Sequence, residues 1–117
     1  MPRFAILIHD FPMLHWDLLL ENGESCRTWR LLQTPATNTR QVPAEQLSDH
    51  RLVYLDYEGP VSGQRGSVVR WDQGALQWLK NHVDYCEVLL TGQHWQGTLC
   101  LNRVDGNDWI VTLVQDD

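Results

Sequence analysis

The sequence predicts a mostly β domain built from antiparallel strands, with little helix. Segments of alternating or apolar-rich character recur at short intervals along the 117 residues, a spacing typical of all-β domains. Turn-forming residues separate these segments, and such short links favour antiparallel pairing. The six tryptophans suit a small sheet protein whose core needs large side chains. The expected strands are residues 4–9, 15–21, 26–32, 67–71, 84–90, 98–104 and 108–114.

The links between these strands differ in length and in turn chemistry. Residues 22–23 are Asn-Gly and residues 105–107 are Asp-Gly-Asn, and both sequences are typical of tight turns between strands. The polar stretch 33–48 contains two prolines, so we expect a long loop there, with one helical turn at residues 44–47. Residues 74–81 fit a helix, a strand or a turn equally well.

Composition and charge limit the classes of protein that the chain can represent. The length suits one domain spanning residues 1–117. A formal net charge of -6 argues against a protein that coats nucleic acid through many phosphate contacts, but it allows a pocket for one terminal phosphate. No apolar run approaches the roughly 20 residues of a membrane-spanning helix, so we expect no membrane association and a cytoplasmic location.

The cysteines do not indicate a disulfide framework or a thiolate metal site. Cys26, Cys86 and Cys100 are odd in number and far apart, and they lack C-x-x-C spacing. We therefore interpret all three as small buried apolar residues.

The first candidate site lies where the first two expected strands meet. In an extended strand, His15 and Asp17 share one face, and an imidazole and a carboxylate at this spacing can hold one cation. His9 ends the preceding strand, and the short loop with Pro12 would bring it to face His15. The three side chains would then form a metal site with open coordination positions. The alternative carries equal weight: His9 caps a strand end, and His15 and Asp17 form a hydrogen-bonded surface pair.

A second candidate follows the expected long loop. His50 and Tyr54 lie four residues apart in an acidic segment, where a catalytic histidine competes with a solvated loop histidine beside a core tyrosine. His82 and His94 have no partner pattern, and we interpret both as surface residues.

Five blocks of sequence occur in a fixed order along most of the chain. A strand ending in His-Asp leads to L-H-x-D-x-x-L-E at residues 14–21, and a tryptophan strand follows at Trp29. D-H-x-L-x-Y-x-x-Y-E-G occupies residues 49–59, V-x-W-D-x-G occupies 69–74, and a leucine with two glycines marks 90–97. Together these blocks resemble the 3′-phosphoesterase domain of bacterial DNA ligase D, the multifunctional enzyme of end joining.

This resemblance implies a small closed β-barrel of about eight antiparallel strands. It also implies a divalent metal inside the barrel mouth, most often Mn²⁺, with Zn²⁺ or Co²⁺ as other possible ions, held by His9, His15 and Asp17. His50 would contact the scissile phosphate and Tyr54 would support the site. The implied activity in DNA repair is removal of a 3′-ribonucleoside or a 3′-phosphate from DNA or RNA-primed DNA ends.

The chain departs from the family pattern among the polar residues around the metal. At Leu7, Leu19, Gln33 and Ser48 the family has Gln, Arg, Lys and an acidic residue, respectively. The metal ligands are thus retained, while the phosphate-binding basic residues are depleted, which predicts weaker activity or a changed substrate. Arg3, Arg40 and Arg65 could supply charge from loops, but we interpret each as a solvated surface residue.

Two alternatives therefore stay open. The first is a catalytically weakened or inactive metal-binding barrel module, a partner of separate ligase or polymerase repair proteins. The second, less favoured, is a non-haem iron oxygenase that uses His15, Asp17 and either His82 or His94 as ligands. We expect the phosphoesterase to be a monomer.

Overall fold

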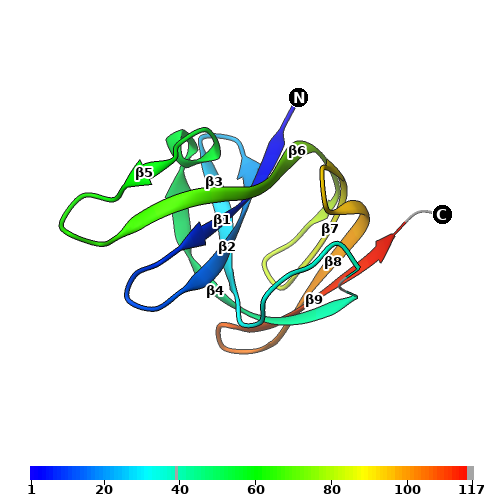
Figure 1. Ribbon diagram of the computed structural model, residues 1–117. Coiled ribbons are helices and arrows are strands. Elements are labelled where there is room, and N and C mark those ends of the chain that lie inside the picture. The colour runs from blue at the N-terminus through cyan, green and yellow to red at the C-terminus, as the bar shows by residue number, and fades with distance from the viewer. Residues whose placement is uncertain (39, 116–117) are drawn as a thin grey trace.

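The computed structural model describes residues 1–38 and 40–115, and eight of its strands form a closed antiparallel barrel (Figure 1). Around the barrel the strands follow the order β1-β2-β3-β4-β9-β8-β7-β6, and pairing of β1 with β6 closes the ring. The ninth strand, β5, is short and pairs with the start of β6. The elements are β1 (Arg3–His9), β2 (His15–Asn22), β3 (Ser25–Leu31), β4 (Gln41–Arg51), the 3-10 helix η1 (Leu52–Leu55), β5 (Gly59–Pro60), β6 (Ser67–Asn81), β7 (Tyr85–Gly92), β8 (Gln96–Asp105) and β9 (Asp108–Gln115).

The expected mostly β barrel is confirmed, and two local expectations need correction. The loop expected at residues 33–48 is wrong in its second half, and no helical turn forms at 44–47, because β4 occupies that part of the chain. Val42 and Ala44 are buried in the core, and β4 pairs with both β3 and β9, so tertiary pairing overrides the local turn signals. Residues 74–81 take the strand alternative as the second half of β6.

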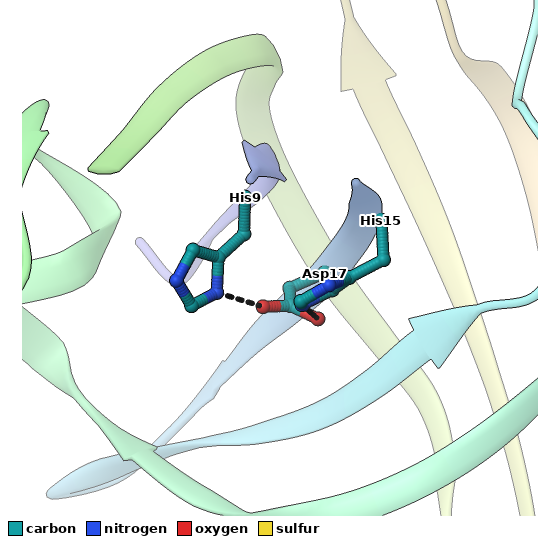
Figure 2. Close-up of side chains that lie close together, drawn as sticks. All are labelled: His9, His15 and Asp17. Carbon is teal, nitrogen blue, oxygen red and sulfur yellow. Dashed lines mark ion pairs between the residues drawn. The ribbon is translucent and has the colours of Figure 1, made fainter. Parts of the chain in front are cut away.

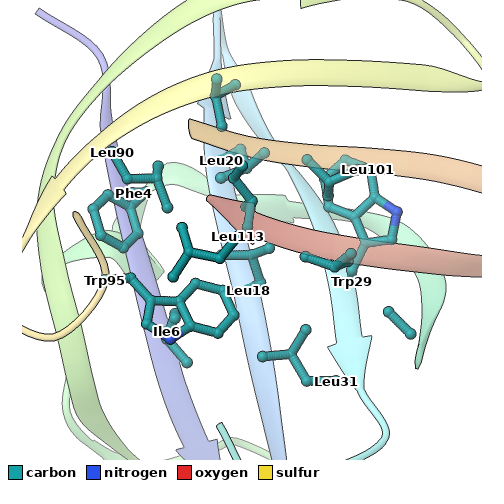
Figure 3. Close-up of a cluster of buried hydrophobic side chains, with 14 of the residues drawn as sticks. Phe4, Ile6, Leu18, Leu20, Trp29, Leu31, Leu90, Trp95, Leu101 and Leu113 are labelled. Carbon is teal, nitrogen blue, oxygen red and sulfur yellow. The ribbon is translucent and has the colours of Figure 1, made fainter. Parts of the chain in front are cut away.

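Alternation along the strands fills the barrel interior with apolar side chains (Figure 3). Trp29, Trp95 and Trp109 are almost fully buried there, as the tryptophan content predicted. The rings of Trp29 and Trp109 meet edge to face, with centroids 5.3 Å apart. The Arg27 guanidinium lies 5.1 Å from the Trp29 ring and donates a hydrogen bond to the carbonyl oxygen of His82, 2.8 Å away. The interior is therefore a packed core.

A second apolar cluster lies on the outer face of β1, β2 and β3. Because side chains alternate, the residues between those of the core point outward, and the chain from η1 to β5 covers them. Partly buried Tyr54 and Tyr57 pack against this outer cluster. Its fully buried members are Ala5, Leu7, Leu19, Cys26, Leu55 and Val68. A cavity lies between this covering segment and the outside of the barrel, next to the end of β1.

The described cysteines are free thiols. Cys26 and Cys86 are buried, as expected, whereas Cys100 is only partly buried. Burial raises the pKa of the Cys26 thiol to about 11.

Within residues 1–38 and 40–115, no helix has the length and apolarity needed to cross a membrane.

Candidate metal centre and adjoining cavity

The two strands β1 and β2 bring the three predicted metal ligands together. His9, the last residue of β1, is the direct cross-strand partner of His15, the first residue of β2. Asp17 follows two residues later on β2 and shares its face with His15. The short β1–β2 connection sets this register, so the sequence spacing translates directly into proximity.

The ligand atoms of these residues lie at distances that suit one cation (Figure 2). His9 Nδ1 is 3.7 Å from Asp17 Oδ2, and His15 Nε2 is 3.3 Å from Asp17 Oδ1. All three groups offer ligand atoms within 4.8 Å of one another. Around a tetrahedral ion with bonds of about 2.1 Å, neighbouring ligand atoms are about 3.4 Å apart. Small side-chain rotations therefore suffice to place all three on one ion.

Main-chain carbonyl groups fix which nitrogen of each imidazole carries hydrogen. His9 Nε2 lies 2.8 Å from the Arg65 carbonyl oxygen, and His15 Nδ1 lies 2.8 Å from that of Met13. A carbonyl oxygen only accepts, so both of these nitrogens donate. His9 Nδ1 and His15 Nε2 are left with lone pairs on the side of Asp17, which is the usual arrangement of metal-binding histidines.

Two buried atoms in this group lack the hydrogen-bond partner that burial demands. His15 and Asp17 are 7% and 3% exposed, and neither His15 Nε2 nor Asp17 Oδ1 makes a hydrogen bond to the described residues. Two lone-pair atoms 3.3 Å apart repel each other unless a proton or a metal ion lies between them. Accordingly, the Asp17 carboxylate raises the pKa of His15, against the opposing effect of burial. The donor set therefore favours a positive charge at its centre and fits a divalent metal.

A cavity of about 460 Å³ adjoins the metal ligands and contains the second predicted pair. His9 and Asp17 line it together with His50, at the end of β4, and Tyr54, in η1. The His50 ring lies 6.1 Å from the Tyr54 ring, and His50 Nδ1 donates to the Ser48 carbonyl oxygen at 3.0 Å. His15 instead lines a neighbouring groove of about 430 Å³. The five predicted residues therefore share one region, although their roles stay predictions.

The structure corrects the expected location of the metal ligands. They do not lie inside the barrel mouth: Phe4 and Ile6 fill the interior, and His9 belongs to the alternate face of the same strand. The site is an outer pocket beneath the segment that runs from η1 to β5.

The family departures have distinct structural settings. Leu7 and Leu19 are buried in the outer apolar cluster, Gln33 lines the groove beside His15, and Ser48 is exposed. A buried leucine at position 19 offers no charge to a phosphate.

The three arginines singled out in the sequence lie at the surface, as expected. Arg3 forms ion pairs with Asp56 and Glu21, and Arg40 is exposed. Arg65 is exposed as well, and it also lines the cavity.

Arg30 and Arg51 also line the cavity, and sequence reasoning missed both. The sequence did place Arg30 directly after Trp29 on the expected tryptophan strand, so its side chain was expected on the face opposite to Trp29. This position became informative only once the register between β2 and β3 was known.

The remaining histidines lie apart from this group. The His94 ring stacks on Trp71 with centroids 4.5 Å apart, and His82 is exposed. In the described ranges, His9, His15 and Asp17 are the one group of three such side chains close enough to hold an ion. The oxygenase alternative therefore lacks its third ligand there.

Comparison with known proteins gives two matches. Residues 8–103 match the family described as the DNA ligase D 3′-phosphoesterase domain. The chain is also 32% identical over 77 residues to the multifunctional non-homologous end joining protein LigD of Pseudomonas aeruginosa, an alignment that covers 62% of this chain. It covers 9% of that relative, so the chain corresponds to a small part of the multifunctional protein.

Proposed function

Because the chain belongs to the DNA ligase D 3′-phosphoesterase domain family, we propose that it is a divalent-metal-dependent phosphoesterase acting on the 3′ ends of DNA or RNA-primed DNA. The observation that carries this proposal is the convergence of His9, His15 and Asp17 at the wall of a cavity that also holds His50 and Tyr54. The name of the Pseudomonas relative supports a role in end-joining repair. The proposal includes action beside a separate ligase or polymerase.

The donor atoms favour a borderline divalent cation. Two imidazole nitrogens and one carboxylate oxygen suit Mn²⁺, Co²⁺ and Zn²⁺, and the family resemblance favours Mn²⁺. Three protein ligands leave coordination positions for water or substrate, as catalytic sites require. When bound, such an ion polarises a phosphoryl oxygen and offsets the charge that develops in the transition state.

The protein's own groups account for proton transfer and orientation. His50 Nδ1 donates a hydrogen bond to the main-chain carbonyl oxygen of Ser48, so His50 Nε2 is the atom available to a ligand. In the protonated imidazole, Nε2–H donates to the leaving 3′ oxygen as water attacks phosphorus. The P–O bond breaks, the leaving oxygen becomes a 3′ hydroxyl, and inorganic phosphate is released. Tyr54, whose ring packs edge-on against His50 and against Tyr57, limits the positions that the imidazole can adopt.

A specific observation favours the second candidate, a metal-binding module with weak or no activity. Leu19 is completely buried among apolar side chains, so β2 supplies no basic group at the position where the family has arginine. Loss of such a charge-assisted contact removes about 1.5–3 kcal/mol of phosphate binding unless another residue replaces it.

The two candidates differ in one measurement. The purified chain is incubated with Mn²⁺ and a primer that ends in a 3′-phosphate or a 3′-ribonucleotide, and release of inorganic phosphate and of the ribonucleoside is followed. We expect release by the unmodified chain and a rate lower by about 10²- to 10⁴-fold in His50→Gln. His82→Gln, at an exposed position, is the matched control. Tight Mn²⁺ binding without any product would contradict the phosphoesterase proposal and favour the module.

A further inference from the structure

Three arginines line the cavity beside the metal ligands, and they differ in how their guanidinium groups are engaged. Arg65 donates from Nε to the Ser62 carbonyl oxygen at 2.7 Å and from Nη2 to Ser62 Oγ at 3.2 Å, which ties it to its own loop. Arg51 is exposed at the end of β4. Arg30 differs from both because it is partly buried within the sheet.

The position of Arg30 places it next to the metal ligands. It is the direct cross-strand partner of Asp17 across the β2–β3 pair, so both side chains leave the same outer face. Arg30 lines the cavity that contains His9 and Asp17, and it also lines the groove that contains His15. Arg30 therefore lies between the cavity and the groove, which both adjoin the metal ligands.

The guanidinium of Arg30 is not committed to a partner within the described chain. Its Nε is buried and has no hydrogen-bond partner there. Asp17 and Glu45 flank it as cross-strand neighbours, yet neither forms an ion pair with it in residues 1–38 and 40–115. A buried donor without a partner is costly, and this one adjoins a cavity large enough for a ligand.

We propose that Arg30 is the anion-binding residue of this site and that it holds the phosphoryl oxygens of the substrate beside the metal ligands. The inference rests on the proposed function and names its ligand class, a terminal phosphate or phosphoester. A guanidinium donates two parallel N–H groups to phosphate oxygens, which fixes orientation as well as charge. Arg30 on β3 thereby supplies the basic group that Leu19 on β2 does not, and the depletion of basic residues noted in the sequence is partly compensated.

The test compares the binding of two ions to one set of variants. Calorimetric titrations measure the affinity for Mn²⁺ and, in the Mn²⁺-loaded protein, for inorganic phosphate. Arg30→Gln should weaken phosphate binding by at least about tenfold, the effect of losing one charge-assisted contact. The same variant should bind Mn²⁺ as tightly as the unmodified chain or more tightly, because a neighbouring positive charge opposes a cation. Arg103→Gln, at an exposed position, serves as the control.

Weaker phosphate binding together with unchanged or tighter Mn²⁺ binding distinguishes a role in anion binding from a general disruption of the fold. Phosphate affinity unchanged in Arg30→Gln, or lost only in Arg51→Gln or Arg65→Gln, would overturn the inference, as would a parallel loss of both ions. If Arg30→Gln does not fold, Arg30→Lys keeps the charge without the planar fork and should bind phosphate with intermediate affinity.

The titrations also separate this inference from the proposed function. If phosphate binding depends on Arg30 but no 3′ end is hydrolysed, the phosphoesterase proposal is contradicted and the role of Arg30 in anion binding is supported. If the chain binds no metal, the phosphate titration is made on the metal-free protein, and its dependence on Arg30 decides the outcome.

Discussion

The three-ligand group predicts that Mn²⁺ stabilises the folded protein and that His9→Ala removes most of this effect. At a free Mn²⁺ concentration of about 100 times the dissociation constant, binding to the folded state alone adds about 2.7 kcal/mol to the free energy of unfolding. A chain of 117 residues has an unfolding entropy of about 0.25 kcal/mol per kelvin. The expected rise in Tm is therefore about 11 °C.

His9→Ala removes one of the three ligands. A full set of four ligands contributes about 10–16 kcal/mol in structural zinc sites, so one ligand represents about 2.5–4 kcal/mol. Its loss weakens binding by on the order of 100-fold or more. At the same Mn²⁺ concentration the remaining stabilisation is about 0.4 kcal/mol, or a shift of about 2 °C. The metal-free variant also loses the hydrogen bond to the Arg65 carbonyl oxygen, which lowers its own Tm by about 4 °C.

The assay is a thermal melt with and without Mn²⁺, followed by circular dichroism. His82→Ala is the matched control because it removes an exposed imidazole, so its Mn²⁺ shift should equal that of the unmodified chain. The reasoning fails if His9→Ala keeps the full Mn²⁺ shift. That result would mean that the ion binds elsewhere, for example to the His15 and Asp17 pair with a third ligand from another strand.

Two further predictions concern stability. The bidentate contact of Arg3 with Asp56 (2.6 and 3.0 Å) lowers the pKa of Asp56 below its ordinary 3.8, so the stability that it contributes is present above that pH and is lost as the pH falls through the lowered value. The difference in urea midpoint between the unmodified chain and Asp56→Asn should thus be largest near neutral pH and vanish in strong acid; a constant difference would count against it. Leu19→Arg, which restores the family residue, should lower the free energy of unfolding by several kcal/mol, because the side chain is fully buried in the outer apolar cluster. A urea midpoint unchanged by this substitution would show that the cluster opens to admit the charge.

Local patterning made much of the barrel and of the ligand group predictable. Alternation along 4–9 and 15–21 identified β1 and β2 and placed His15 and Asp17 on one face. Because only five residues connect the two strands, His9 pairs directly with His15. The short distance between the two imidazoles therefore followed from the length of the connection. By contrast, β4 was missed because two prolines and a polar run resemble a loop, and only pairing with β3 and β9 makes that segment a strand.

The sequence by itself determined which residues alternate along each strand, where the chain turns, and which imidazoles and carboxylate stand next to one another. These properties depend on neighbours a few residues apart, and the polypeptide geometry fixes them. Only the tertiary structure decided that the site lies outside the barrel beneath η1, that Leu19 is buried there, and that Arg30 stands beside Asp17. Those facts depend on the register between strands and on the segment that covers the sheet, and both are set by packing between residues far apart in the chain.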